Sequence, residues 1–315
     1  MCDLDKVPQL YLRGFCEAAD IDSKFTMILG DTLTPEKKHY SIRGLRKVDL
    51  IFNSDLSRWE FIKIKTKSVI AYTNDTNDYP IGTYAWQFTN EICGESGNQQ
   101  LLILSTCGED EYSCSDGECI PMEDRCNNEI TCEDRSDEND CDMIHFPGGY
   151  WTNYPPPNLK RQSVFAPRSH DSDNGTLIKV YLAEFEILSI DNWEEQVSVM
   201  FHLYLAWKDT RLTYSDLKST PFLNTLYYEH AKMVWTPNIA FSPANKLLTS
   251  EQMEAENPGL VLMLKKGNFT LNEKSELVKR RIYRGDENDL VKKSYCSVDF
   301  ICSFDLFWYP FLFLF

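Results

Sequence analysis

The stretch CGEDEYSCSDGECIPMEDRCNNEITCEDRSDENDC, residues 107–141, decides how one part of this 315-residue chain can fold. It holds six of the eleven cysteines, together with thirteen acidic residues and two arginines, a net charge of −11 within a total of −16. So few apolar residues cannot form a core, and segments of this kind fold around disulfides or a metal. We therefore expect a small disulfide-stapled module.

Cysteine usage and glycosylation sequons indicate an extracellular chain. No CxxC pair is present, which disfavours the usual zinc sites, and Asn74, Asn174 and Asn268 lie in N-x-[ST] sequons. The acidic balance disfavours nucleic acid as a partner. The N-terminus lacks the basic and apolar regions of a signal peptide, and no apolar stretch is long enough to span a membrane. We expect membrane contact only through segments missing here, and both ends read as truncated.

Residues 107–141 resemble the low-density lipoprotein receptor class A repeat across their whole length. The resemblance rests on the cysteine spacing, on Tyr112, Gly117 and Ile120, and on the Ser136-Asp137-Glu138 run. It implies three disulfides among the pairings that six cysteines allow: Cys107–Cys119, Cys114–Cys132 and Cys126–Cys141.

The same resemblance implies a calcium site. Its side-chain ligands would be Asn127, Thr131, Asp137 and Glu138, with backbone carbonyls from Asp124 and Glu129. The family has carboxylates where this chain has Asn127 and Thr131, and calcium affinity depends on how many charged oxygens the site supplies. We expect calcium binding to be weak or absent, so the module is either a stapled spacer or a metal-bound binding module.

A glycine- and proline-rich linker over residues 142–160 separates the module from a second region, 161–315. In VSVMFHLYLAW, residues 197–207, every second side chain is apolar, which predicts a strand with one buried face. WKDTRL (207–212), WTPN (235–238) and CSFDLFWYPF (302–311) resemble motifs of the extracellular ligand-binding domain of pentameric Cys-loop ligand-gated ion channels.

That resemblance implies a truncated, immunoglobulin-like β-sandwich, and, in a complete family member, a small-molecule agonist and homologous subunits in a pentamer. The signature loop would be carried by Cys302, Asp305, Trp308, Pro310 and Phe311. Cys302 would lack its partner cysteine, because the terminal LFLF replaces the second half of the loop. Without the remaining strands we expect open edges and an exposed apolar face.

Three ligand-binding residues are implied by the same motifs: His202, Trp235 and Phe241, the last interchangeable with Ser242 by a one-residue shift. His202 lies opposite the apolar face of its strand, where it would contact a ligand or be a solvated or interface histidine. Trp207 and Trp235 fit core anchors better than walls of a ligand cage.

Residues 8–106 read as all-β, from short apolar runs such as RWEFIK and LLILSTC. They resemble the lectin-like or pentraxin-like β-sandwich of composite channel-like proteins. Cys16 and Cys93 are the natural disulfide pair, which leaves Cys2 and Cys296 unassigned.

Enzyme motifs such as HExxH and G-x-S-x-G are missing from the sequence, which favours a binding protein. We expect the extracellular portion of a channel-like receptor subunit. The alternative is a secreted or cell-surface binding or adhesion protein that uses the channel-type sandwich as a scaffold.

Overall fold

The computed structural model divides the chain into two compact units. The first comprises residues 1–141 and 270–282, and the second comprises residues 142–269 and 283–315. The structure describes residues 8–16, 19–29, 40–74, 79–89, 99–157, 176–226, 228–237, 239–241, 248–249 and 260–301.

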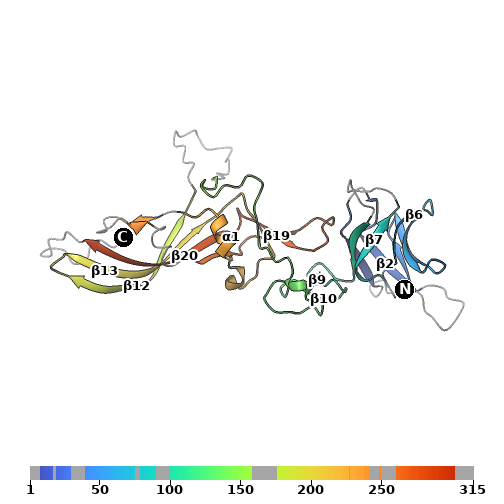
Figure 1. The fold of residues 1–315 in the computed structure, drawn as a ribbon, viewed down its shortest axis with the longest axis horizontal. Helices are drawn as coiled ribbons and strands as arrows, with labels where there is room; N and C mark the ends of the chain where they lie inside the picture. The colour runs from blue at the N-terminus through green and yellow to red at the C-terminus, as the bar shows by residue number, and fades with distance from the viewer. Residues whose placement is uncertain are drawn as a thin grey trace, which may run out of the picture. The chain divides into compact units, whose positions relative to one another are not determined.

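The first unit contains a closed barrel of eight antiparallel strands, each paired with its neighbours in sequence (Figure 1). They are β1 (Gln9–Arg13), β2 (Lys24–Leu29), β3 (Tyr40–Gly44), β4 (Val48–Asn53), β5 (Arg58–Lys63), β6 (Val69–Thr73), β7 (Gly82–Phe88) and β8 (Gln99–Ser105). The all-β prediction is confirmed. The expected two-sheet sandwich over residues 8–106 does not form, because β1 pairs with β8 and closes the ring.

The barrel closes because the first and last strands bury their leucine side chains in the same hydrophobic core. Leu12 of β1 lies opposite Leu104 of β8, and each is 1% exposed. Aromatic residues fill the centre, where the ring centroids of Phe61 and Trp86 are 4.4 Å apart. Pairing the two edge strands buries both apolar faces and removes both open edges.

The second unit contains most of the residues of two four-stranded sheets. One has the order β11 (Ile144–His145), β14 (Thr213–Ser215), β19 (Arg281–Arg284) and β18 (Phe269–Leu271); the other has the order β12 (Lys179–Asp191), β13 (Gln196–Trp207), β20 (Asp289–Ile301) and β17 (Leu260–Leu264). Short elements complete the unit: a 3₁₀ turn (Pro221–Asn224), α1 (Tyr228–Met233), β15 (Ala240–Phe241) and β16 (Leu248–Thr249). Within the described residues, no helix has the length and hydrophobicity of a membrane span.

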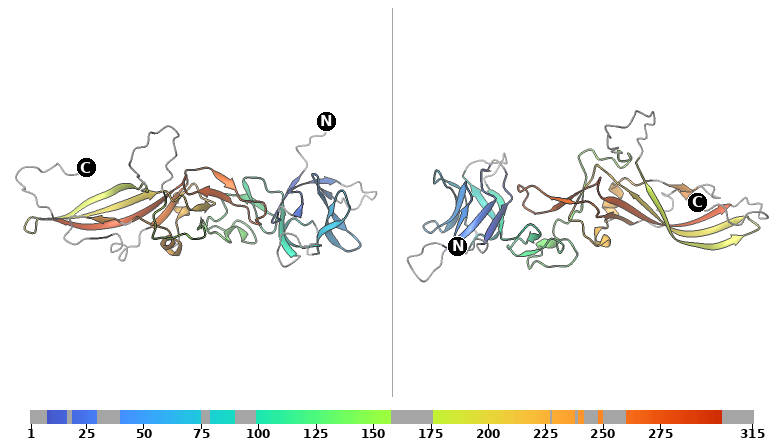
Figure 2. Two further views of the ribbon diagram at one scale, coloured as in Figure 1. Left: turned by 90° about the horizontal axis from the view of Figure 1, so that it is seen from above. Right: turned by 180° about the vertical axis from the view of Figure 1, so that it is seen from behind.

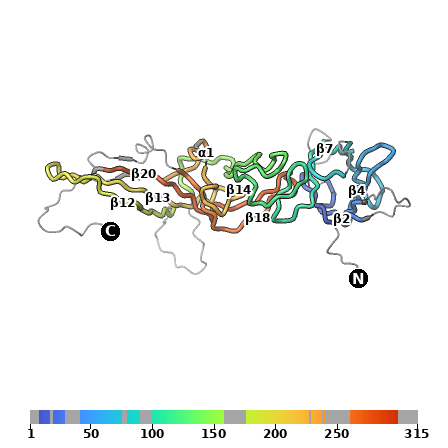
Figure 3. The backbone as a smooth tube through the Cα atoms, turned by 90° about the horizontal axis from the view of Figure 1, so that it is seen from below, coloured from blue at the N-terminus to red at the C-terminus, as the bar shows by residue number. Residues whose placement is uncertain are grey.

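Strand β13 confirms the predicted alternation. Its side chains at Val199, Phe201, Leu203, Leu205 and Trp207 are buried in one core, and the intervening residues up to Tyr204 are only partly buried. The strand pairs over its whole length with β20, and Figures 2 and 3 show β12, β13 and β20 running side by side. This long central strand therefore supplies most of one wall of the core.

Strand β12 lies at the edge of that sheet and keeps its apolar side chains exposed. The exposed set includes Val180, Tyr181, Leu182, Phe185, Ile187, Leu188 and Ile190. Its pairing with β13 is interrupted by register shifts near Glu184, whose φ is 53°. Strand β12 therefore presents a continuous apolar surface at the edge of the sheet.

The WKDTRL motif ends β13 in a network of charged and polar groups. Arg211 donates from Nε to Asp209 Oδ1 at 2.8 Å and from Nη2 to Oδ2 at 2.7 Å. The Tyr150 hydroxyl donates to Asp209 Oδ2 at 3.0 Å and accepts a hydrogen bond from the backbone N–H of Trp235 at 2.9 Å. Burial and the neighbouring Asp209 charge raise the pKa of Tyr150 to about 12, which keeps its hydroxyl protonated and able to donate.

Cys296 on β20 is buried in the core of the second unit and is the free cysteine of the described residues. Burial raises the pKa of its thiol to about 11. Cys16 in the first unit is disulfide-bonded. Its expected partner Cys93, and Cys2, lie outside the described residues.

Replacing Arg211 with alanine should destabilise the second unit. Asp209 is 0% exposed, and without Arg211 its carboxylate would stay buried with Tyr150 as its remaining side-chain donor. Removing one partner of a buried ion pair costs about 3–5 kcal/mol. Urea unfolding followed by tryptophan fluorescence should show a clearly lower midpoint. Lys208→Ala is the matched control, because Lys208 makes an exposed hydrogen bond to a backbone carbonyl; an equal loss in both variants would contradict the assigned role.

Candidate functional site

The acidic segment forms a compact repeat held by three disulfides. A short hairpin, β9 (Glu111–Ser113) and β10 (Cys119–Pro121), is followed by a 3₁₀ turn at Ser136–Glu138. The disulfides join Cys107 to Cys119, Cys114 to Cys132 and Cys126 to Cys141, which is the pairing implied by the class A resemblance. The links hold the three parts of the segment together where apolar packing is scarce.

Arg125 completes the small core of the repeat, a role that the sequence did not reveal. It is 1% exposed, and its guanidinium carbon lies 5.0 Å from the centre of the Tyr112 ring. It donates to the carbonyls of Asn139 and Asp140 at 3.3 Å each. Tyr112 in turn donates to the carbonyl of Ser136 at 3.0 Å. The cation thus holds the C-terminal end of the repeat against its first hairpin.

Asp137 and Glu138, two of the residues expected to bind calcium, lie in the 3₁₀ turn and bond to the loop that holds Asn127 and Thr131. Glu138 Oε1 accepts the N–H groups of Asn127 and Asn128 at 2.8 and 3.1 Å. Asp137 Oδ2 accepts the N–H of Thr131 at 2.7 Å. The loop between Cys126 and Cys132 is therefore held to the Asp137 and Glu138 carboxylates through its backbone N–H groups.

Asp137 provides the test of whether a cation fits this cage. The residue is 0% exposed, and its Oδ1 is buried without a hydrogen-bond partner among the described residues. An unpaired buried carboxylate oxygen is costly, and a bound cation would satisfy it. Asn127 Oδ1 accepts the N–H of Glu129 at 2.8 Å, so this amide oxygen is partly engaged. The cage suits a calcium ion, with fewer charged ligands than the family pattern has.

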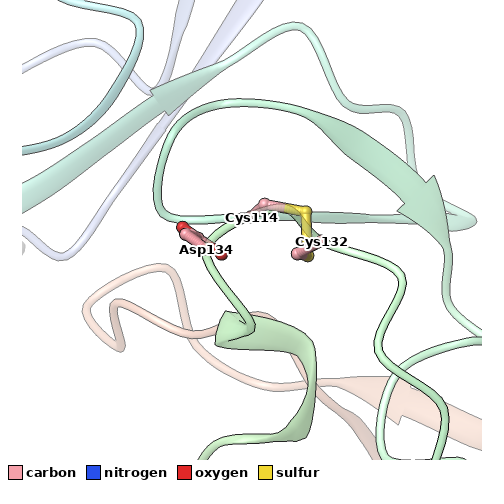
Figure 4. A group of neighbouring side chains, drawn as sticks. All are labelled: Cys114, Cys132 and Asp134. Atoms are coloured by element: carbon pink, nitrogen blue, oxygen red, sulfur yellow. A yellow bond between two sulfur atoms is a disulfide. The ribbon is translucent and has the colours of Figure 1, made fainter.

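A second group of potential metal ligands in the repeat does not form a metal site. Cys114, Cys132 and Asp134 lie close together (Figure 4), as do Cys114, Asp116 and Glu118. Both groups depend on Cys114, whose sulfur is bonded to that of Cys132. Metal ligation needs a thiolate, and a disulfide sulfur cannot supply one.

His202 lies on the face of β13 opposite the buried stripe, as predicted. Its Nδ1 is 2.5 Å from Glu184 Oε2, and its ring meets the Tyr295 ring edge-on at a centroid distance of 5.4 Å. Tyr295 lies directly opposite His202 on β20, and Glu184 follows Ala183, the residue of β12 opposite His202, at the start of a register shift. The His202 imidazole, the Tyr295 phenol and the Glu184 carboxylate thus lie together on one partly exposed patch.

Trp235 is not brought to that patch. It packs against the core of the second unit, where its ring meets Trp207 edge-on at 6.1 Å. The expectation that these tryptophans are core anchors agrees with this placement, and the ligand-binding role of Trp235 stays a prediction.

Of the other residues predicted from the sequence to have a role, two are exposed and the side chains of the rest lie outside the described residues. Asn74 and Asn268 are exposed, as glycosylated asparagines must be. The Phe241 side chain lies outside the described residues, and so do Asn174 and the proposed signature-loop residues Cys302, Asp305, Trp308, Pro310 and Phe311.

Comparisons with known proteins converge on the repeat. Residues 105–141 match the model of the family described as low-density lipoprotein receptor domain class A. The vitellogenin receptor of Solenopsis invicta is 39% identical over 61 residues, which are 17% of this chain and 3% of that protein. SCO-spondin is 43% identical over 47 residues in Rattus norvegicus and 44% over 48 residues in Gallus gallus, each 15% of this chain and 1% of the relative. No solved structure matches the chain. This chain thus carries a class A repeat at residues 105–141 and spans only a small fraction of the relatives it matches.

Proposed function

We propose that this chain is the extracellular portion of a ligand-gated ion channel-like receptor subunit. In this proposal the second unit is the ligand-binding unit, its partners are homologous subunits and a small-molecule agonist, and the chain has no catalytic activity. The barrel and the class A repeat are accessory binding modules carried by the same chain. Three disulfides in the repeat support an extracellular location.

The observation that carries the proposal is the network at the end of β13. The motif residues Asp209 and Arg211 bond to each other and to Tyr150, whose hydroxyl also accepts the Trp235 N–H. Trp207 and Trp235 meet edge-on in the core beside this network. Two motifs that are distant in sequence, WKDTRL and WTPN, thus share one set of contacts. A buried network of this kind makes the residues of the two motifs depend on one another for their positions.

A binding or adhesion protein remains the second candidate. The family match lies on the class A repeat, and the relatives reported above are named a vitellogenin receptor and SCO-spondin. The transcript that encodes the chain separates the two candidates. Continuation into D-x-Q-x-C and four apolar spans supports the receptor, and a stop codon directly after Phe315 supports the binding protein.

Within the receptor proposal, the patch formed by His202, Tyr295 and Glu184 is the ligand contact surface. The Glu184 side chain is 67% exposed and the His202 side chain 22% exposed, so a small molecule can reach both. A carboxylate and a phenol can accept hydrogen bonds from an amine, and an imidazole can donate to an acid. The patch therefore suits a small polar agonist such as an amino acid or a biogenic amine.

For the class A repeat we propose a low-affinity calcium site in the cage of Asp137 and Glu138. The buried, unpaired Asp137 Oδ1 favours a cation. The amide at Asn127 and the hydroxyl at Thr131 supply two fewer negative charges than the family pattern. Sites with few charged ligands bind calcium with dissociation constants of about 10⁻⁴–10⁻³ M in extracellular modules.

Restoring the missing carboxylates should tighten calcium binding. We expect Asn127→Asp with Thr131→Asp to lower the dissociation constant by about tenfold or more, because each change adds a negative charge to the cage. Asp137→Asn should abolish binding. Calorimetric titration of the full disulfide-bonded chain measures all three. Glu133→Gln, an exposed acid of the same repeat, is the control and should bind as the wild type does. Submicromolar binding by the wild type, or unchanged binding by Asp137→Asn, would refute the weak cage.

The ligand patch can be tested with known small transmitters as probes. Glycine, glutamate, γ-aminobutyrate, acetylcholine and serotonin are screened for an increase in the melting temperature of the chain. At least one should stabilise the wild type, and His202→Ala should remove that increase while leaving the unliganded melting temperature near its original value. His230→Ala is the matched control, because His230 is a similarly exposed histidine on α1 that faces Asp142. An effect that survives His202→Ala, or a screen without any stabilising compound, would count against the patch.

A further inference from the structure

A basic hairpin covers an acidic face of the class A repeat within the first unit. The hairpin is TLNEKSELVKRRI, residues 270–282, which belong to the same compact unit as the barrel and the repeat. Asn272 fixes its shape: its backbone N–H donates to the carbonyl of Arg280 at 3.1 Å, and its side-chain oxygen accepts the N–H of Arg280 at 3.0 Å. Bonds within the segment, through both the backbone and the side chain of Asn272, thus hold its two ends together.

Two arginines of the hairpin pair with three acids of the repeat. Arg280 donates to the carbonyl of Asp140 at 3.0 Å and forms an ion pair with its carboxylate. Arg281 reaches Glu123 Oε1 at 2.9 Å and Asp110 Oδ1 at 3.2 Å. The two arginine side chains are only 9% and 11% exposed, although their acidic partners are largely exposed. These cations are therefore seated against the repeat instead of being solvated.

Lysine and valine contacts extend the same surface. Lys279 donates from Nζ to the carbonyl of Glu111 at 2.9 Å and also to that of Gly108. Burial lowers the pKa of Lys279 to about 8, and the charge of Arg13 adds to the shift. Val278 packs against the core of the repeat beside Tyr112 and Met122. One edge of the hairpin thus combines three cations with an apolar contact.

The acidic face is separate from the calcium cage. Asp110, Glu123 and Asp140 bind the hairpin, whereas Asp137 and Glu138 bind the N–H groups of their own loop. A cation in the cage and the hairpin on the outer face can therefore be present together.

We propose that this acidic face is a recognition site for a basic, arginine-containing hairpin, and that residues 270–282 are its ligand within the same chain. The repeat then serves as an internal docking module, and its outer face is closed to basic partners while the hairpin is seated. A segment of the same chain that is already seated must be displaced first, so an outside peptide of the same kind competes poorly. The inference stands on contacts within the first unit and is independent of the receptor proposal.

Competition with a synthetic hairpin tests the proposal. The probe is a fluorescent, cyclised peptide with the sequence of residues 270–282, titrated into the full disulfide-bonded chain and followed by anisotropy. We expect the Arg280→Ala/Arg281→Ala chain to bind the probe at least about tenfold more tightly than the wild-type chain, because its own hairpin no longer holds the face. Added salt should weaken that binding, since the contacts are ionic.

Three controls make the result decisive. Arg284→Ala removes an arginine on the same strand that pairs locally with Asp286, and this chain should behave as the wild type does. Adding Asp110→Asn, Glu123→Gln and Asp140→Asn to the double variant should abolish probe binding. A probe with both arginines replaced by alanine should not bind. Equal binding of the probe to wild type and double variant, or no binding to the double variant while calcium titration shows the repeat intact, would overturn the proposal.

Discussion

Negative charge packed into a small disulfide-bonded repeat is the constraint on which the first unit depends. Residues 107–141 carry thirteen carboxylates and few apolar side chains, so their fold needs cross-links and counter-charges. The three disulfides supply the cross-links, and Arg125 supplies a buried internal cation. Arg280 and Arg281 supply cations from a segment that is remote in sequence. The hairpin arginines pair with carboxylates of the repeat, whereas Arg125 bonds to the backbone carbonyls of Asn139 and Asp140.

This arrangement links regions of the chain that the sequence presents as separate. The hairpin contacts the barrel as well as the repeat, because Arg13 of β1 donates to Asn272 Oδ1 at 2.6 Å and the Gly14 N–H donates to the carbonyl of Lys274 at 2.8 Å. The barrel, the repeat and the hairpin therefore stabilise one another. Removing a charge from the hairpin should therefore lower the stability of both the barrel and the repeat.

Local sequence patterns predicted which side of a strand is buried, but they did not predict contacts between segments that are distant in sequence. The period-two stripe from Val199 to Trp207 fixed the buried face of β13 and the opposite face for His202, because strand geometry alone decides both. Barrel closure depends on pairing β1 with β8, and the docking of residues 270–282 depends on which of many surface charges meet. Neither leaves a periodic signal in the sequence. The cage residues could be placed only through the class A resemblance, since their spacing has no meaning outside that disulfide framework.

We propose that two sets of cations besides Arg125 stabilise the acidic repeat: calcium in the cage of Asp137 and Glu138, and the arginines of the seated hairpin. Hydrogen–deuterium exchange of the full disulfide-bonded chain, with and without calcium and at low and high salt, tests it directly. The account predicts that calcium slows exchange in residues 124–138 without changing that of residues 270–282, which are protected at low salt and exchange faster at high salt. Hairpin amides that exchange at the rate of an open loop at low salt would contradict it.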